Sequence, residues 1–189
     1  LAGLPKAAED YRADYAAYYD RCKKPDSPAL RDPNAVIWLV PGVGMFSFAL
    51  DKATARISGE FYVNAINVMR GASTVSTYQG LPEQEAFDIE YWLLEEAKLQ
   101  RMPKPKAMQG RVAFITGGAG GIGSATAERL LREGCNVVLA DIDQTALDEV
   151  VSGFGKRYGR DMVRGVVMDV TSEAAVIAAV EFTVAEYGG

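Results

Sequence analysis

The chain has 189 residues, and its content of 49% hydrophobic and 24% charged residues is ordinary for a globular protein, which argues against a disordered or fibrous chain. It contains no histidine, and Cys22 and Cys135 lack the spacing of a metal or redox site, so neither a zinc site nor a Ser-His-Asp triad is expected. The net charge is -5 and the basic residues are dispersed, so we expect a small-molecule partner and no nucleic acid.

Neither a membrane span nor a signal peptide is predicted. Apolar runs are interrupted by Gly, Asn, Asp or Glu, and no basic stretch followed by an apolar core opens the chain. We therefore expect a cytoplasmic protein without a membrane partner. The chain begins with Leu1 and ends at Gly189 directly after a helical pattern, so we expect it to be a fragment.

The first hundred residues predict a small α+β segment. Strand-forming residues flank a Pro-Gly-Val-Gly stretch, which predicts two strands joined by a tight turn. Pro82 suits the first turn of an acidic helix, and Gly71 suits the end of the helix before it. The tyrosines near the start are expected to form a packed amphipathic face. The expected elements are a helix near 10–20, strands at 36–40 and 45–49, and helices at 52–70 and 82–100.

A linker is predicted where prolines alternate with lysines. Pro103 and Pro105 cannot continue a helix, and such a stretch favours an extended, semi-rigid backbone. We therefore divide the chain into a first part at 1–102, a linker at 103–110 and a second part at 111–189.

The second part alternates strictly between strand and helix patterns. This alternation predicts right-handed crossovers and a parallel sheet, about half of a doubly wound domain. The predicted fold class is therefore α/β, with a partial Rossmann-type parallel sheet preceded by a smaller α+β segment. The expected elements are strands at 111–118, 136–142 and 163–170, and helices at 123–133 (closed by Gly134), at 144–158 and from Ser172 onward.

Five glycines occupy the first strand-to-helix turn of this part. Each costs roughly 0.5–1 kcal/mol relative to alanine inside regular structure, so the loop needs either forced backbone geometry or a ligand close to the main chain. A helix N-terminus offers free N–H groups and a positive dipole end, which suit a pyrophosphate. Gly117 would permit the tight turn, Gly121 the approach of the phosphates, and Gly123 the close packing of helix on sheet. Gly118, Gly120 and Gly123 also satisfy the G-x-G-x-x-G fingerprint.

Asp141 ends the second strand, 18 residues after Gly123, close to the spacing of about 20 at which an acidic residue meets the adenosine ribose. A carboxylate there accepts from both ribose hydroxyls and repels a 2′-phosphate. Its neighbours Ala140 and Ile142 supply no basic side chain, so NAD is favoured over NADP. The alternative is that Asp141 opens a turn or caps the next helix, for which Asp143 is the better candidate.

Several motifs of the second part occur together: QGRVAFITG at 109–117, the T-G-x-x-x-G-x-G run that begins at Thr116, Asp141, and Asp169-Val170 after the third strand. In this combination, residues 109–189 resemble the start of a short-chain dehydrogenase/reductase. The resemblance implies that Asp169 contacts the adenine amino group, that Val170 lines the adenine pocket and that Thr116 braces the loop. The expected cofactor-binding residues are Thr116, Gly117, Gly118, Gly120, Gly121, Ile122, Gly123, Asp141, Ile142, Asp169 and Val170.

The catalytic motifs of that family do not follow the glycine loop here. The family has an Asn-Ala-Gly segment, a Ser and a Tyr-x-x-x-Lys pair, in which Lys lowers the pKa of Tyr for proton exchange. The Tyr-x-x-x-Lys from Tyr19 to Lys23 precedes the loop by about a hundred residues, and we expect it to be non-catalytic. We therefore assign no catalytic residue and expect the 189 residues alone to be inactive.

The stretch VPGVGMFSFALDKATARISGEFYVNA at 40–65 is similar to the closing part of class II aldolase/adducin domains. The position of that family's metal-binding histidine is Pro or Gly here, so no metal is expected. Together with the second part, this stretch resembles the bifunctional rhamnulose-1-phosphate aldolase/short-chain dehydrogenase type. That resemblance implies rhamnose breakdown, in which the dehydrogenase oxidises the lactaldehyde released.

The predicted function is that of an NAD-dependent oxidoreductase for a small alcohol or aldehyde such as lactaldehyde, in a polypeptide linked to a sugar-phosphate aldolase. The alternative is a non-catalytic dinucleotide-binding or assembly module. A methyltransferase uses a related glycine turn, but the T-G-x-x-x-G-x-G form argues against it. We expect a homo-oligomer, because the apolar first strand at 111–116 would form an open sheet edge, which either pairs with a second copy or is covered by the upstream segment.

Overall fold

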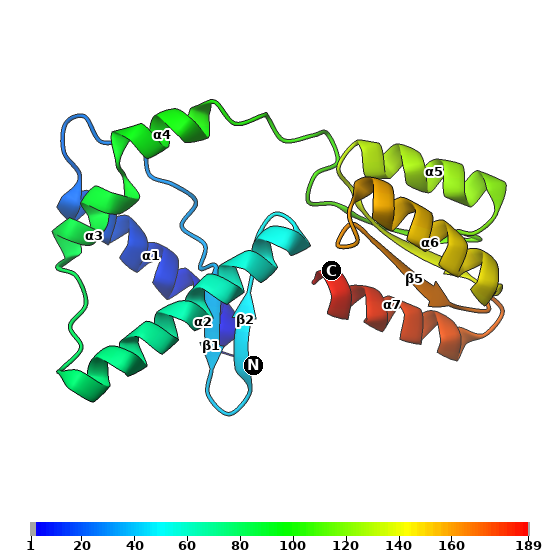
Figure 1. The fold of residues 1–189 in the computed structure, drawn as a ribbon, viewed down its shortest axis with the longest axis horizontal. Coiled ribbons are helices and arrows are strands. Elements are labelled where there is room, and N and C mark those ends of the chain that lie inside the picture. Colours follow the sequence, from blue (N-terminus) through cyan, green and yellow to red (C-terminus); the bar gives the residue numbers. More distant parts are fainter. Residues whose placement is uncertain (1–2, 189) are drawn as a thin grey trace. The chain divides into compact units, whose positions relative to one another are not determined.

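The computed structural model describes residues 3–188 and is shown in Figure 1. The chain separates into two compact units. The first unit comprises Leu1–Phe48 and Arg56–Lys104, and the second comprises Ala49–Ala55 and Pro105–Gly189. Within residues 3–188, no helix combines the length and the apolar character needed to cross a bilayer.

The chain up to Gln100 contains a β-hairpin and four helices. Strands β1 and β2 are antiparallel, with Trp38 opposite Phe46, and Gly42 in the turn between them has a φ of 74°. The expected hairpin is therefore confirmed. The elements are α1 (Leu4–Cys22), β1 (Ile37–Val40), β2 (Gly44–Ser47), α2 (Lys52–Val75), α3 (Glu83–Glu90) and α4 (Leu93–Gln100).

An aromatic cluster joins α1 to α3. Phe87 and Tyr91 are almost fully buried, and their rings stack with centroids 4.5 Å apart. Tyr18 and Tyr19 of α1 pack against this pair, with ring centroids 5.7 Å and 5.9 Å from that of Phe87. Aromatic pairs at such distances contribute about 0.5–1.5 kcal/mol beyond the area that they bury. The packed tyrosine face expected near the start of the chain is therefore confirmed.

The single helix expected over 82–100 is wrong, because two helices, α3 and α4, are separated there by Tyr91 and Trp92. Trp92 has an extended backbone, with φ -65° and ψ 126°. Tyr91 ends α3 with its ring in the aromatic cluster and its hydroxyl 2.7 Å from that of Tyr15. Helix propensity depends on the local sequence and does not include these tertiary contacts of Tyr91. The contacts override the propensity at this point.

Helix α2 extends to Val75, so the end expected at Gly71 is also wrong. Gly71 does not have a positive φ, and the helix continues through it. The Thr74 hydroxyl donates to the Gly71 carbonyl at 2.6 Å, and the Ser73 hydroxyl donates to the Met69 carbonyl at 2.8 Å. The hydroxyl groups of these two side chains thus donate hydrogen bonds to carbonyl groups near the C-terminus of α2. The helix therefore continues past residue 71 and does not use Gly71 as its end.

The second unit is built on a parallel three-stranded sheet in the order β3-β4-β5, with helices on both faces (Figure 1). The register pairs Phe114 with Val138, and Val138 with Arg164. This sheet and the small antiparallel hairpin before it confirm the predicted fold class. The elements are β3 (Val112–Thr116), α5 (Gly121–Arg132), β4 (Asn136–Asp141), α6 (Gln144–Tyr158), β5 (Val163–Val167) and α7 (Glu173–Tyr187).

Strand β4 is the centre of the core of this unit. The side chains of residues 137–140 are fully buried. Leu139 packs in a cluster with Leu147 of α6, whereas Ala140 packs in another cluster with Ala179 of α7. Because successive side chains of a strand point to opposite faces, β4 is covered by helices on both sides.

Within the described residues, strand β3 pairs with β4 alone. The Asn136 N–H donates to the Arg111 carbonyl at 2.8 Å. Alternate residues of a strand bond to the same neighbour in a parallel ladder, so the amides of Val112 and Phe114 face away from β4. Self-association through this edge is not tested by the structure and stays a prediction.

Phe87 and Phe61 offer a matched test of the aromatic cluster, because Phe87 is 1% exposed and Phe61 is 72% exposed. Phe87→Ala should lower the free energy of unfolding by about 3–5 kcal/mol, since it removes the ring on which three tyrosines pack. Phe61→Ala should change it by less than about 0.5 kcal/mol. Trp38 and Trp92, the two tryptophans of the chain, both lie in the first unit, so tryptophan fluorescence in urea reports on this unit. Equal urea midpoints of unfolding for the two variants would contradict the role of the aromatic cluster as a core.

Candidate functional site

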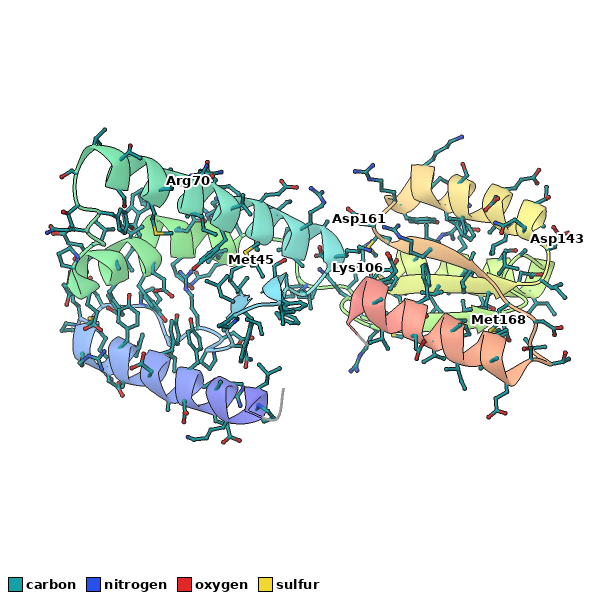
Figure 2. All side chains as sticks on the ribbon, turned by 90° about the horizontal axis from the view of Figure 1, so that it is seen from below. Met45, Arg70, Lys106, Asp143, Asp161 and Met168 are labelled. Atoms are coloured by element: carbon teal, nitrogen blue, oxygen red, sulfur yellow. The ribbon has the colours of Figure 1, made fainter. Side chains whose placement is uncertain are left out.

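The carboxyl ends of the parallel strands lie at one edge of the second unit. Figure 2 shows Asp143, which follows β4, and Met168, which follows β5, at this end, whereas Asp161, which precedes β5, lies at the opposite end. The glycine loop follows β3 at the same edge, and residues 141–142 and 169–170 lie at or just beyond the ends of β4 and β5. The topology thus brings all of the predicted cofactor-binding residues to this edge.

Backbone hydrogen bonds hold the loop between β3 and α5. The Gly118 N–H donates to the Ala140 carbonyl of β4 at 3.0 Å, and the Gly120 N–H donates to the Gly117 carbonyl at 3.1 Å. The Ser124 N–H donates to the Gly120 carbonyl at 2.8 Å, which begins the bonding pattern of α5. The chain therefore turns tightly off β3 and is tied to the end of β4.

The fold itself requires glycine at three positions of this loop. Gly117 has a φ of 63°, in the left-handed region that favours glycine. A Cβ at Gly123 would lie 2.2 Å from the Gly117 carbonyl oxygen, and a Cβ at Gly118 would lie 2.8 Å from the Cβ of Leu139. These contacts agree with the tight turn and the close helix packing expected of Gly117 and Gly123.

Gly121 has no such structural requirement. A Cβ on Gly121 would meet no atom within 4 Å, and its φ is not positive. It is the first residue of α5, where the fold would accept an alanine. The space beside Gly121 is therefore open to a ligand that lies close to the main chain.

The N-terminus of α5 presents unpaired hydrogen-bond donors. No side chain caps the helix at Gly120, and the N–H groups of Gly121, Ile122 and Gly123 form no hydrogen bond with the described residues. The helix dipole places a partial positive charge at the same point. No lysine or arginine lies within 116–125, so an anion here would be held by backbone dipoles.

Asp141 ends β4, and its carboxylate contacts the glycine loop. Its Oδ1 accepts from the Asp143 N–H at 3.2 Å, and its Oδ2 accepts from the Ala119 N–H at 3.0 Å. These N–H donors of Asp143 and Ala119 favour the ionised form and hold the pKa of the Asp141 carboxyl below its ordinary value. The capping role falls to Asp143, whose Oδ1 accepts from the Ala146 N–H at 3.0 Å at the start of α6.

Exposed apolar side chains surround the same edge. Ile122 is 87% exposed, Ile142 is 69% exposed and Val170 is 60% exposed, so a ligand that covered them would gain hydrophobic free energy. Asp169 lies beside Val170, and its Oδ1 accepts from the Thr171 hydroxyl at 2.7 Å and from the Thr171 N–H at 2.8 Å. These two bonds lower the pKa of Asp169 and leave its Oδ2 without a partner among the described residues.

The bracing role that the resemblance implies for Thr116 is not tested and stays a prediction. Its hydroxyl forms no hydrogen bond within residues 3–188, and the loop is held instead through Gly118 and Ala119. The bond from Ala119 to Asp141 was missed in the sequence analysis. The two residues are 22 positions apart and the donor is a backbone group, so no side-chain pattern marks the pair.

The Tyr-x-x-x-Lys of the first unit has structural partners. The Tyr19 hydroxyl donates to the Pro28 carbonyl at 2.7 Å, and its ring packs on Phe87 and Tyr91. The Lys23 ammonium group donates to Asp20 at 2.7 Å. Both groups are engaged in contacts within their own unit.

Two family models match the chain. Residues 1–99 match the aldolase class II family, second domain, and residues 111–189 match the short chain dehydrogenase family. The uncharacterized oxidoreductase YuxG of Bacillus subtilis (strain 168) is 37% identical over 190 residues, which cover 100% of this chain and 27% of that protein. The sex determination protein tasselseed-2 of Zea mays is 39% identical over 87 residues, which cover 46% of this chain and 24% of that protein.

One similar solved structure covers less than half of the chain. The 3-ketoacyl-(acyl-carrier-protein) reductase from Brucella melitensis, complexed with NADH, is 35% identical with a TM-score of 0.39, and the match covers 42% of this chain and 30% of that one. This chain thus spans between 24% and 30% of the length of these three proteins. Through residues 1–99 the chain belongs to the aldolase class II family, and residues 111–189 match the short chain dehydrogenase family, which together fit a bifunctional aldolase/short-chain dehydrogenase architecture.

Proposed function

We propose that the second unit binds NAD for an oxidoreductase that transfers hydride to or from a small alcohol or aldehyde. The observation that carries this proposal is Gly121, whose lack of a side chain serves no contact in the fold but leaves the N-terminus of α5 open. The unpaired N–H groups there suit the pyrophosphate of a dinucleotide. The other loop glycines are explained by packing or backbone conformation, so they carry less weight.

The choice of NAD over NADP rests on Asp141. An aspartate is ionised at neutral pH at its ordinary pKa, and the Asp143 and Ala119 N–H groups lower that pKa further. An ionised carboxylate accepts hydrogen bonds from ribose hydroxyls and repels a 2′-phosphate, and no basic residue is adjacent in the sequence. Asp169, Val170, Ile122 and Ile142 would contact the adenosine half of the cofactor.

We propose lactaldehyde as the substrate and rhamnose breakdown as the setting. The support is the order of the two families along the chain, which fits an aldolase whose product passes to a dehydrogenase. The proposed parts are the closing part of an aldolase domain at 1–102, a linker at 103–110 and the first half of a NAD-binding domain at 111–189.

Gly121→Ala and Gly123→Ala should separate binding from folding. The methyl group at position 121 meets no atom, so the apparent Tm should change little, but NAD affinity should fall about tenfold, because the methyl group occupies the space of the phosphates. The methyl group at position 123 collides with the Gly117 carbonyl, so Gly123→Ala should destabilise the protein by about 1–3 kcal/mol. Calorimetry and thermal unfolding measure the two effects. Unchanged NAD affinity in Gly121→Ala would remove the main support for the proposed site.

Asp141→Ala should reduce the preference for NAD over NADP. In the intact protein, NAD should bind at least tenfold tighter than NADP, a difference of about 1.4 kcal/mol. The variant loses both the acceptor for the ribose hydroxyls and the charge that repels a 2′-phosphate. Titration calorimetry with both cofactors gives the ratio for each protein. Equal affinities in the unchanged protein would exclude Asp141 as the selective residue.

The 189-residue chain should not oxidise any small alcohol or aldehyde, because no Tyr-x-x-x-Lys follows the glycine loop within 111–189. NADH absorbance after incubation with NAD and lactaldehyde measures the activity. Tyr19→Phe is the control variant, since Tyr19 and Lys23 have the catalytic spacing but are engaged in structural contacts. An NADH signal that Tyr19→Phe abolishes would show that this pair is catalytic after all.

A further inference from the structure

We propose that Asp141 is also a positioning residue, which holds the glycine loop in the shape that receives the phosphates. This inference rests on the proposed function, because it concerns the same dinucleotide site. Its basis is the hydrogen bond from the Ala119 N–H, in the middle of the loop, to Asp141 Oδ2 at 3.0 Å. The spacing from Gly123 to Asp141 in the sequence indicates a role toward the ribose alone.

The loop has few other restraints. Its glycines carry no side chains and have more backbone freedom than other residues, so their conformation depends on the hydrogen bonds that they make. The Gly118 N–H bonds to the Ala140 carbonyl at 3.0 Å, and the Ala119 N–H, next along the chain, bonds to Asp141. Of these two bonds, the one to Asp141 has an ionised acceptor, which makes a hydrogen bond about twice as strong as a neutral one.

The carboxylate has enough acceptor sites for both tasks. A carboxylate offers about four lone-pair sites on its two oxygens. The Asp143 N–H occupies one site on Oδ1, and the Ala119 N–H occupies one site on Oδ2. The Ile142 N–H also acts on the carboxylate, and the acceptor sites that remain are open to the ribose because the side chain is only half-buried. A bound ribose therefore need not displace the loop from Asp141.

The two roles of Asp141 predict different changes in the affinity for a ligand that has a diphosphate but no ribose hydroxyl. 2′,3′-Dideoxy-ADP carries the diphosphate but has no ribose hydroxyl for Asp141 to bind. If Asp141 acted on the ribose alone, its removal would leave the affinity for this ligand unchanged or raise it, because a negative charge near the diphosphate is lost. If Asp141 positions the loop, its removal should weaken binding of the same ligand.

The test measures the affinities of ADP and 2′,3′-dideoxy-ADP by calorimetry in the intact protein, in Asp141→Ala and in Asp143→Ala. We expect Asp141→Ala to bind the dideoxy ligand about fivefold more weakly. Asp143→Ala is the matched control: it removes a carboxylate two residues away but keeps the backbone N–H that bonds to Asp141, so its affinity should stay within about twofold. Equal or tighter binding of the dideoxy ligand by Asp141→Ala would overturn the proposal.

Hydrogen exchange of the Ala119 amide, without any ligand, gives an independent readout. Its exchange should be faster in Asp141→Ala, while the buried amide of Val138 stays protected. If the unchanged protein binds neither nucleotide, the proposed function fails, and this exchange rate alone decides the positioning role. If the Val138 amide loses its protection in Asp141→Ala, Asp141→Asn is measured in its place. The neutral amide oxygen of Asp141→Asn should also make exchange at the Ala119 amide faster. Unchanged exchange at Ala119 in a folded variant would overturn the proposal.

Discussion

The burial of strand β4 is the constraint on which the second unit depends. Its residues 137–140 are fully buried, since helices cover both faces and β3 and β5 pair with both of its edges. A strand enclosed in this way has one register that satisfies its backbone and side chains together. The position of its carboxyl end is fixed as a result. Asp141 and the carbonyl of Ala140, which both contact the glycine loop, are located by the core.

The electrostatic field at this edge of the sheet differs between the glycine loop and the ends of β4 and β5. The loop attracts an anion through backbone N–H groups, whereas the side chains of Asp141, Asp143 and Asp169 are all acidic. A phosphate group therefore finds favourable electrostatics over the start of α5 and unfavourable electrostatics at the ends of β4 and β5. A ligand with its anionic centre at the loop and neutral hydroxyls or bases near the carboxylates fits this field.

The elements of the second unit could be predicted because strand and helix periods alternate there with clear punctuation. Gly134 follows α5 with a φ of 87°, and Asp143 caps α6, as their sequence positions indicate, while Ser172 is the cap of α7. In the first unit, the break at Tyr91 depends on rings from α1, about seventy residues earlier in the chain, so local pattern predicts an unbroken helix. The contact from Ala119 to Asp141 could not be predicted for a related reason: it joins a backbone donor to a side chain that the fold brings near.

The close approach of Gly118 to Leu139 links the composition of the loop to that of the core. A Cβ at position 118 would lie 2.8 Å from the Cβ of Leu139, a residue that is itself fully buried in the central strand. The same Cβ would lie 3.0 Å from the backbone Cα of Leu139, so a smaller side chain at 139 would not make room for a larger residue at 118. The central strand itself therefore restricts position 118 to glycine. Sequence change in the glycine loop is thus restrained by folding stability, independently of any ligand that the loop binds.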